Sequence, residues 1–492
     1  MRPFGYRGYI RCRPAFFLEC VKNDNAKAAS KGKLTLLEIL CAEWARQAGS
    51  VQARGANVDS RSLREDKLPP ELPAKWRNEG STRMSASTNS LLSDAEREAV
   101  IELRHAMHRE PELSNAEWKT QERIRRMLQR FGITGAKPFH NTGLYIDIEG
   151  TASGPKRSIA VRGDIDALPI QEARDDLPYR SQVDGIMHAC GHDVHASIAL
   201  GTALAFHRMR ENFAGKVRVF FQPAEEAEPL GGRTVKEEKL LDGFDGAVGF
   251  HVSPDIPAGM LDACEGPITK SADQFKLTIT GKMAHGASPH NGVDAIAIAA
   301  AFVNEVQKLI SREMPIDDAA VVTIGTIHGG EATNIICPSV IMEGTIRTRS
   351  PERRALLSQR VREVAEGVAR MHRGQAECII RTGEPPVVND SDMVQRFRQV
   401  VHDTLGREAL TAKKRAAGSD DFGFYAASVP SIYFWFGTRA TGNESLLHTP
   451  TFGASDELVV PTTELTVRYV LDLLNPRDCL SADSPATRTE QL

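Results

Sequence analysis

The sequence lacks several features that mark particular classes of protein. No run of about 18 apolar residues occurs among its 492 residues, so we expect neither a membrane-spanning helix nor a membrane partner. The net charge is only −3 and aromatic residues make up 6% of the chain, which argues against a nucleic-acid partner. With 41% hydrophobic and 25% charged residues, the composition is that of an ordinary globular protein with several domains.

Closely spaced cysteine pairs are also absent. Eight cysteines are spread along the chain, and none of them forms a Cys-x-x-Cys motif. This spacing argues against a secreted disulfide framework, so we predict a reducing, cytoplasmic location. Only Cys190 lies among other side chains that are able to bind a metal ion.

Residues 1–88 differ from the rest of the chain in charge. They contain sixteen Lys and Arg against nine Asp and Glu, a local charge of +7. Four arginines precede the first acidic residue, Glu19, as in a transit peptide, but no clear cleavage site follows. The alternative, which we favour, is an upstream region with Met84 as the actual start. On either interpretation we predict a poorly ordered extension, and we also predict a disordered tail at 477–492.

The pattern from residue 89 onwards is that of an α/β protein. Ser93 and Glu96 have the spacing of a capping box at the start of a helix. Short apolar segments rich in β-branched residues then alternate with helical patterns. We predict strands at 144–148, 158–161, 217–221, 247–250 and 432–436, and a helix at 194–210. Such alternation predicts a catalytic domain with a mostly parallel sheet, formed by 89–270 and 385–476.

The intervening residues, 271–384, predict an inserted domain of a different kind. A half-exposed strand begins at Gln274 and is followed by a helix, two strands, a helix and a strand. These elements are predicted at 293–311, 319–327, 339–347, 351–371 and 376–381. The β-α-β-β-α-β order is typical of a ferredoxin-like α+β unit, which is inserted into the larger domain.

Polar residues follow three of the predicted catalytic strands. Asp164 comes shortly after Val161, Glu225 and Glu226 follow the strand at 217–221, and His251 follows Phe250 directly. Ligands of open α/β sheets bind beyond the carboxyl ends of the strands, so we expect these side chains to converge. Several carboxylates in one pocket repel one another unless a cation lies between them, which predicts a divalent metal.

The run from His188 to His195 adds three histidines and Cys190 within eight residues. A lone histidine is more often a hydrogen-bonded core residue than a ligand, but this density favours metal binding. Thiolate and imidazole donors suit zinc, manganese, cobalt or nickel better than magnesium or calcium. Adjacent glutamates such as Glu225 and Glu226 are usually solvated, yet here they follow an apolar strand. One could bind metal while the other acts as a general base.

Six short runs in this order resemble the aminoacylase–carboxypeptidase G metallopeptidase family. The resemblance is to its amidohydrolase branch, which includes hippurate hydrolases, N-acyl-amino-acid amidohydrolases and plant auxin-conjugate hydrolases. It covers residues 95 to 475. The runs begin or centre on Arg104…Leu113, Asp164-Ile-Asp166-Ala-Leu-Pro, His188-Ala-Cys-Gly-His-Asp-Val-His, Gln-Pro-Ala-Glu225-Glu226, Gly-Phe-His251-Val and His285-Gly-Ala-Ser-Pro-His290.

The resemblance implies a site with two metal ions and a catalytic carboxylate. The implied metal ligands are Cys190, His192, Glu226, His251 and His448. Glu225 is implied as the base that takes a proton from water and passes it to the leaving amine. Asp164 is implied as a residue that orients a ligand. Asp420 stands where the family more often has Glu, so any hydrogen bond from it to a ligand histidine must be rebuilt.

The resemblance also implies that the inserted domain at 271–384 serves as a lid and dimerisation domain, and that it carries three functional residues. His285 matches a histidine that stabilises the oxyanion, often from the other subunit of a homodimer, although it could be a turn histidine. Asn334 and Arg347 match positions near the substrate carboxylate, although Arg347 could be a surface residue. The expected activity is hydrolysis of N-acyl amino acids. A dipeptidase or carboxypeptidase of the same fold and a non-catalytic metal-binding relative are the alternatives.

Overall fold

The computed structural model describes residues 90–316, 319–411, 418–439 and 445–475. The predicted N-terminal extension and the predicted tail at 477–492 lie outside these residues. None of the described helices has the length and apolarity needed to cross a membrane.

The larger sheet has seven strands and is mixed. Its order is β1-β2-β4-β3-β5-β15-β6, in which β4, β3, β5 and β15 are mutually parallel. Strands β2 and β6 run antiparallel to their neighbours β4 and β15, and the edge strand β1 pairs antiparallel with β2. The predicted α/β class with a mostly parallel catalytic sheet is therefore confirmed at its centre. The strands are β1 Lys137–Phe139, β2 Gly143–Thr151, β3 Ser158–Asp164, β4 Ala214–Gln222, β5 Gly246–Pro257, β6 Leu261–Asp262 and β15 Ser431–Arg439.

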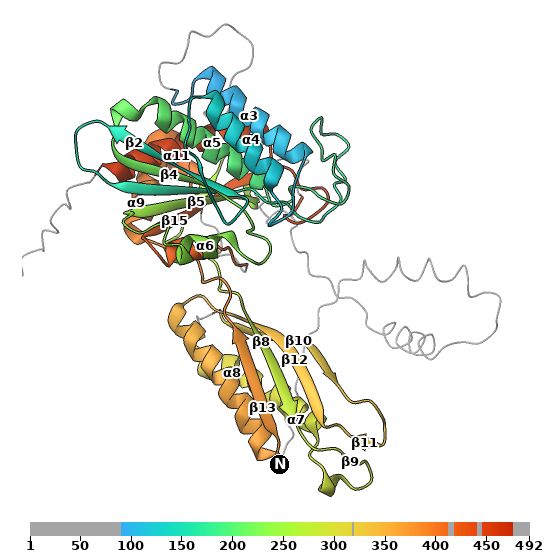
Figure 1. Cartoon of the computed structure of the whole chain (residues 1–492). Coiled ribbons are helices and arrows are strands. Elements are labelled where there is room, and N and C mark those ends of the chain that lie inside the picture. Colours follow the sequence, from blue (N-terminus) through green and yellow to red (C-terminus); the bar gives the residue numbers. More distant parts are fainter. Residues whose placement is uncertain (1–89, 317–318, 412–417, 440–444, 476–492) are drawn as a thin grey trace, which may run out of the picture. The chain divides into compact units, whose positions relative to one another are not determined.

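Helices cover both faces of this sheet (Figure 1). The strands alternate their side chains between two separate apolar cores, as the pleat requires. In β4, for example, Val219 and Phe221 belong to the core that also holds α3, α5, α9 and α11. Phe220 belongs to the core shared with α6 and α10. The helices are α3 Asp94–Arg109, α4 Trp118–Arg130, α5 His192–Arg208, α6 Gly231–Glu237, α9 Ser391–Leu405, α10 Gly423–Ala426 and α11 Val459–Leu474.

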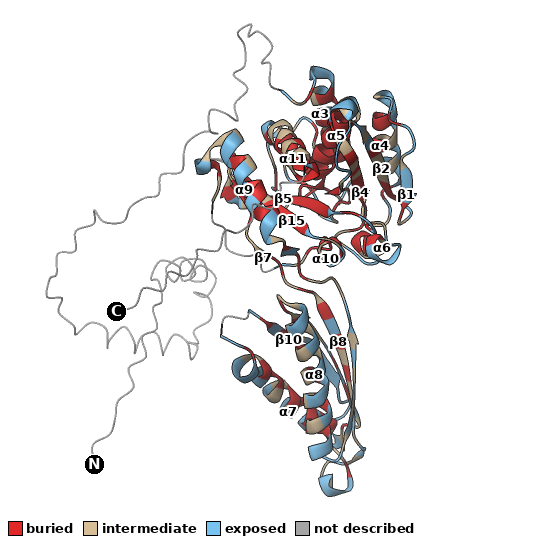
Figure 2. Ribbon diagram, turned by 90° about the vertical axis from the view of Figure 1, so that its left-hand side faces the viewer, coloured by how far each residue is buried: buried red, intermediate tan, exposed pale blue. Residues whose placement is uncertain are grey.

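Helix α5 is the central helix and is buried along nearly its whole length (Figure 2). It begins directly after Gly191, which has a φ of +89°. A Cβ atom built on Gly191 would lie 2.6 Å from Val252 Cγ2, so both the backbone angle and the packing require glycine here. This turn fixes Cys190 and His192 against the neighbouring strand β5.

The second sheet is antiparallel and has the order β10-β12-β8-β13. Helices α7 and α8 pack on it around a core of their own. The predicted β-α-β-β-α-β unit is confirmed, and we refer to it as the lid. Its elements are β8 Asp273–Thr280, α7 Ala295–Lys308, β10 Val321–Gly329, β12 Ser339–Arg347, α8 Pro351–Met371 and β13 Gln375–Arg381, with short pairs β9 Ala284–His285 with β11 Ile335–Ile336 and β7 Gly266–Pro267 with β14 Val388–Asn389.

Several predicted strands extend further than expected, and the strand predicted at 247–250 is the clearest case. The sequence suggested that Phe250 ends its strand, but β5 continues to Pro257. The reason is that the parallel ladder with β15 extends past this point, pairing His251 with Trp435 and Val252 with Phe436. His251 therefore lies within a strand, where its backbone is fixed on one side by β15.

Candidate metal centre

The five residues proposed as metal ligands come from four segments of the catalytic sheet. Cys190 lies in the loop before α5, and His192 is the first residue of that helix. Glu226 follows β4, His251 lies within β5, and His448 lies in the loop after β15. We call these five side chains the donor cluster.

The side chains of the donor cluster lie against one another. Cys190 Sγ is 3.3 Å from His251 Nε2 and 3.2 Å from His448 Nε2. Glu226 Oε1 is 3.2 Å from His448 Nε2 and 3.9 Å from His192 Nε2. Cys190 and His448 are 258 positions apart in the chain, so only the fold brings them together.

Hydrogen bonds set two histidines of the cluster in the form that binds a metal. The Nδ1–H of His192 donates to the carboxylate of Asp166 at 3.0 Å, and the Nδ1–H of His251 donates to the carbonyl oxygen of Val252 at 2.7 Å. Each histidine therefore turns its Nε2 towards the cluster. A hydrogen-bonded second nitrogen is the usual arrangement for a metal-binding histidine.

Two atoms of the donor cluster are buried without a hydrogen-bond partner in the described part of the chain. These atoms are His192 Nε2 and Glu226 Oε1, whose contact with His448 Nε2 at 3.2 Å lacks the geometry of a hydrogen bond. Leaving a buried polar atom unpaired costs about 1–3 kcal/mol, so such atoms call for a partner. A thiol, three imidazoles and a carboxylate fit a borderline-soft divalent cation. The donor set therefore fits the predicted metal.

The charges around the donor cluster also favour a bound cation. Six carboxyl groups gather here against one buried guanidinium, that of Arg162: Asp164, Asp166, Glu225, Glu226, Asp420 and Asp421. Burial and then the charges of Glu226 and Glu225 raise the pKa of the Cys190 thiol well above its ordinary value. Cys190 can therefore ionise only with a positive charge beside it.

Glu225 lies next to the donor cluster. One of its carboxylate oxygens lies within 4.8 Å of ligand atoms of His192 and Glu226, and it also lies within that distance of Asp420 and Asp421. Burial, followed by the negative charges of Asp420 and Glu226, raises the pKa of Glu225 well above its ordinary value. A carboxyl group with a raised pKa is suited to exchanging protons near neutral pH.

The backbone near the cluster is strained at two non-glycine residues. Ala224 has a φ of +51° and His448 a φ of +59°, both in the left-handed region. The backbone N–H of His448 donates to the carbonyl oxygen of Ala189 at 2.9 Å, which holds this loop beside Cys190. Strain of this kind persists where surrounding contacts impose it, and it is frequent at functional sites.

A model of the peptidase family M20/M25/M40 matches residues 160–472, more than half of the chain. The chain belongs to this family. The match includes every residue of the donor cluster. The predicted resemblance and the prediction of a metal-dependent hydrolase are both confirmed at this level.

Individual relatives of the M20 family are similar over most of their length. The hydrolase y4tI of Sinorhizobium fredii, itself uncharacterised, is 72% identical over 79% of this chain and 96% of its own. N-acetyl-L-cysteine deacetylase of Bacillus subtilis is 36% identical over 82% of this chain and 97% of its own. The structure of Bacillus subtilis YxeP, a dinuclear metal binding peptidase of the M20 family, has a TM-score of 0.68 and 33% identity over 78% of this chain and 99% of that one.

Two aspartates at the carboxyl end of β3, Asp164 in its last position and Asp166 just beyond it, support the cluster in different ways. Asp164 accepts a hydrogen bond from His195 Nδ1 at 2.7 Å, and His195 Nε2 in turn accepts the N–H of Val252. The partner of His192 is instead Asp166, to which the sequence analysis gave no role. Asp166 Oδ2 also accepts the backbone N–H groups of Glu225 and Glu226, each at 3.0 Å. The Asp-x-Asp spacing at the strand end was the available signal.

The lid residues predicted to act in this M20 site are arranged differently. His285 and Asn334 lie side by side, because Gly286 N–H donates to the carbonyl oxygen of Asn334 at 2.7 Å, and both side chains are exposed. Arg347 lies at the end of β12, where its Nη1 donates to Ser419 Oγ at 3.1 Å. Among the described residues, none of the three has a hydrogen bond or ion pair to the donor cluster.

Asp420, which stands where the family more often has Glu, accepts its hydrogen bonds from residues outside the donor cluster. Its Oδ1 accepts the backbone N–H of Phe422 at 2.7 Å, and its Oδ2 accepts the hydroxyl of Tyr433. Tyr433 is therefore the side chain that donates a hydrogen bond to this carboxylate. No ligand histidine is hydrogen-bonded to Asp420 among the residues described.

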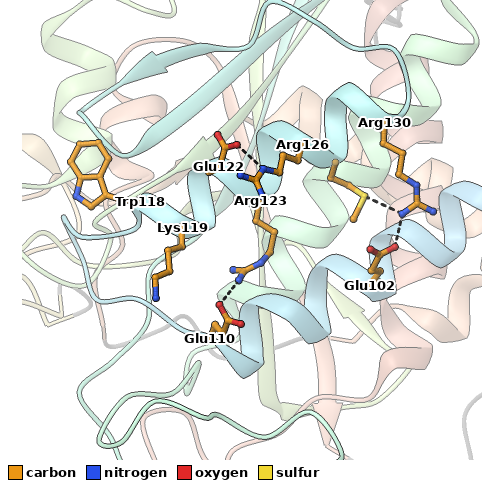
Figure 3. Close-up of a pocket in the computed structure, with 9 residues that line it drawn as sticks. Glu102, Glu110, Trp118, Lys119, Glu122, Arg123, Arg126 and Arg130 are labelled. Carbon is orange, nitrogen blue, oxygen red and sulfur yellow. Dashed lines mark hydrogen bonds and ion pairs between the residues drawn. The ribbon is translucent and has the colours of Figure 1, made fainter.

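An open cavity of about 570 Å³ lies elsewhere in the catalytic domain, between α3 and α4 (Figure 3). Its polar lining is largely neutralised by ion pairs such as Glu110–Arg123 and Glu122–Arg126. It contains no member of the donor cluster. The candidate metal ligands therefore lie at the strand ends of the sheet and not in this cavity.

Proposed function

We propose that this protein is a dinuclear-metal hydrolase that cleaves the amide bond of N-acyl amino acids, either hippurate-like or N-acetyl compounds. The products are a carboxylate and a free amino acid. One observation carries the proposal: thiol, imidazole and carboxylate donors converge beside Glu225, a carboxyl group with a raised pKa. The deacetylase named among the relatives supports the choice of substrate class.

The donor cluster would hold the ions, with Cys190, His192, Glu226, His251 and His448 as ligands. Manganese, zinc, cobalt or nickel suits this mixture of sulfur, nitrogen and oxygen atoms. Two divalent cations bound here would polarise the scissile carbonyl group and lower the pKa of the attacking water.

Glu225 is the proposed general base. It removes a proton from the attacking water as the oxygen forms a bond to the carbonyl carbon. It then returns that proton to the amine nitrogen, and the carbon–nitrogen bond breaks. The raised pKa of Glu225 favours its holding the proton between these two steps. Asp164 acts indirectly, by orienting His195, whose Nε2 accepts the backbone N–H of Val252 in β5.

The lid supplies the remaining proposed contacts. His285 donates to the oxyanion that forms as the carbonyl is attacked, and it does so from the partner subunit of a homodimer. Asn334 and Arg347 bind the α-carboxylate of the substrate, for which an amide and a planar guanidinium are suitable donors. The exposure of His285 and Asn334 is consistent with groups that meet their partners only in an assembled enzyme.

A substrate panel tests the proposed function. After chelation, the enzyme is reloaded separately with manganese, zinc, cobalt or nickel and assayed on N-acetyl and N-benzoyl amino acids beside unmodified dipeptides. We expect at least one acyl series to be hydrolysed well above the dipeptides. Preferential cleavage of dipeptides would instead identify a peptidase. Metal binding without turnover on any of these compounds would indicate a non-catalytic relative. The predicted cytoplasmic location is part of the same proposal.

A further inference from the structure

Glu117 is a fully buried carboxyl group that the proposed mechanism does not use. It lies directly before α4, but its side chain makes no capping hydrogen bond to that helix. The first N–H groups of α4 are satisfied by another residue, Glu112, which accepts from Lys119 N at 3.2 Å and Thr120 N at 2.8 Å. The role of Glu117 therefore lies outside its own helix.

The two oxygens of Glu117 contact two other segments. Oε2 accepts the hydroxyl of Thr142 at 2.6 Å, and Oε1 accepts the backbone N–H of Ala224 at 2.9 Å. Ala224 is fully buried and has the left-handed φ of +51°. Since a non-glycine residue disfavours this conformation, an outside contact must hold it there.

The consequence of this contact is the direction of Glu225. With Ala224 held by Glu117, the next two N–H groups, those of Glu225 and Glu226, both turn towards Asp166 Oδ2. Consecutive glutamates then diverge, one as a member of the donor cluster and the other beside it. An unheld Ala224 would relax towards negative φ and rotate the segment that follows it.

We propose that Glu117 is a positioning residue that, together with Thr142, holds Ala224 in its left-handed conformation and thereby aims Glu225 at the reacting water. This inference rests on the proposed function for the part that concerns Glu225. The required property of Glu117 is an acceptor oxygen and not a negative charge. In agreement, burial and then the charge of Asp166 raise the pKa of Glu117 to about 7, so its neutral form is accessible.

Three variants separate this role from a merely structural one. Glu117→Leu fills a similar volume but leaves the N–H of Ala224 without an acceptor. Glu117→Gln keeps an acceptor oxygen, and the Thr142 hydroxyl can reverse to accept from the new amide. Glu117→Leu combined with Ala224→Gly removes the backbone strain, because glycine adopts positive φ freely. Glu122→Leu, on the exposed side of α4, is the matched control.

Hydrogen–deuterium exchange of the metal-free protein gives a readout that needs no activity. We expect the backbone amides of residues 224–226 to exchange faster in Glu117→Leu, and to be unchanged in Glu117→Gln and in the control. In the metal-loaded enzyme, kcat of Glu117→Leu should fall about 10- to 100-fold with little change in KM or metal content. The glycine double variant should recover most of that loss.

Each contrary result overturns the inference separately from the proposed function. Unchanged exchange in Glu117→Leu would show that Glu117 does not hold the segment. Faster exchange with wild-type kcat would show that its position does not matter for turnover. A Glu117→Gln variant as impaired as Glu117→Leu would assign the effect to charge. Should Glu117→Leu fail to fold, Thr142→Val supplies the same test, with an expected loss in kcat of about 3- to 10-fold from the weakened contact. Failure of the proposed function would instead appear in the wild-type substrate panel.

Discussion

The catalytic sheet and the lid carry predicted functional residues in opposite physical states. Around the catalytic sheet, Cys190, His192 and His251 are buried, and the rings of the two histidines are held by hydrogen bonds to Asp166 and to the carbonyl oxygen of Val252. In the lid, His285 and Asn334 are exposed; His285 lies in β9, and Asn334 directly precedes its partner strand β11. The buried donors are therefore fixed by the fold itself, whereas the exposed lid residues are accessible to a partner.

Removing a cluster ligand should give the largest effect. Cys190→Ala deletes the one sulfur donor, which lies at 3.2–3.3 Å from two of the histidines. We expect loss of metal and loss of measurable turnover while the fold is retained, because both domains have their own apolar cores. Elemental analysis and circular dichroism check this. Full metal content in the variant would contradict the ligand assignment.

Glu225→Gln should remove catalysis and leave the metal in place. Loss of a general base lowers the rate by about 10²–10⁴-fold, and Glu225 is outside the proposed ligand set. The measurement is kcat with metal content determined on the same sample. Turnover at the wild-type rate with metal bound would show that another group moves the proton. A parallel loss of metal would make Glu225 a ligand.

His285→Ala tests whether the exposed lid contributes to catalysis at the buried donor cluster. We expect kcat to fall by about 10²-fold, the effect of losing one oxyanion donor, with little change in metal content. If His285 acts in the partner subunit, mixing this inactive variant with Glu225→Gln should restore activity. Random exchange then gives about a quarter of the wild-type rate, from the one complete site in each mixed dimer. No restoration would place His285 in its own subunit or outside the site.

The smallest expected effect is on the free energy of unfolding, through the buried side chain of His108. Both ring nitrogens of His108 donate to carboxylates, Nδ1 to Asp193 and Nε2 to Glu172. Burial acts to lower the pKa of His108, but these carboxylates outweigh it and raise the pKa to about 9. Because the folded pKa lies above the ordinary value of about 6.5, the stabilisation is fully present below pH 6.5 and is lost as pH rises through about 9.

His108→Gln measures that contribution. The difference in unfolding free energy between wild type and variant should be of the order of 3 kcal/mol at pH 6 and should shrink towards pH 10. Denaturant titrations at several pH values check this, with His402→Gln on the exposed side of α9 as the control. A difference that is constant across this range would mean that His108 is not charged in the folded protein.

Much of the fold could be predicted because it depends on local patterns. The capping box of Ser93 and Glu96 forms as expected, and the strand predicted at 339–347 has those same limits. The end of β5 could not be predicted, since it depends on the ladder with β15, whose residues lie about 180 positions later in the chain. Two of the catalytic-domain carboxylates were also missed in the sequence, Asp166 as the partner of His192 and Glu117 as the partner of Ala224.

Local sequence patterns were sufficient to predict the fold class, the chemical inventory of the site and the order in which its donors occur. The reason is that the pleat of a strand, the turn of a helix and short motifs are set by neighbouring residues. Tertiary structure alone decided which atoms meet: that Cys190 lies against His448, that Asp166 supports two loops, and that Ala224 is held in a strained conformation. These contacts depend on strand register and packing between distant segments, which no local pattern encodes.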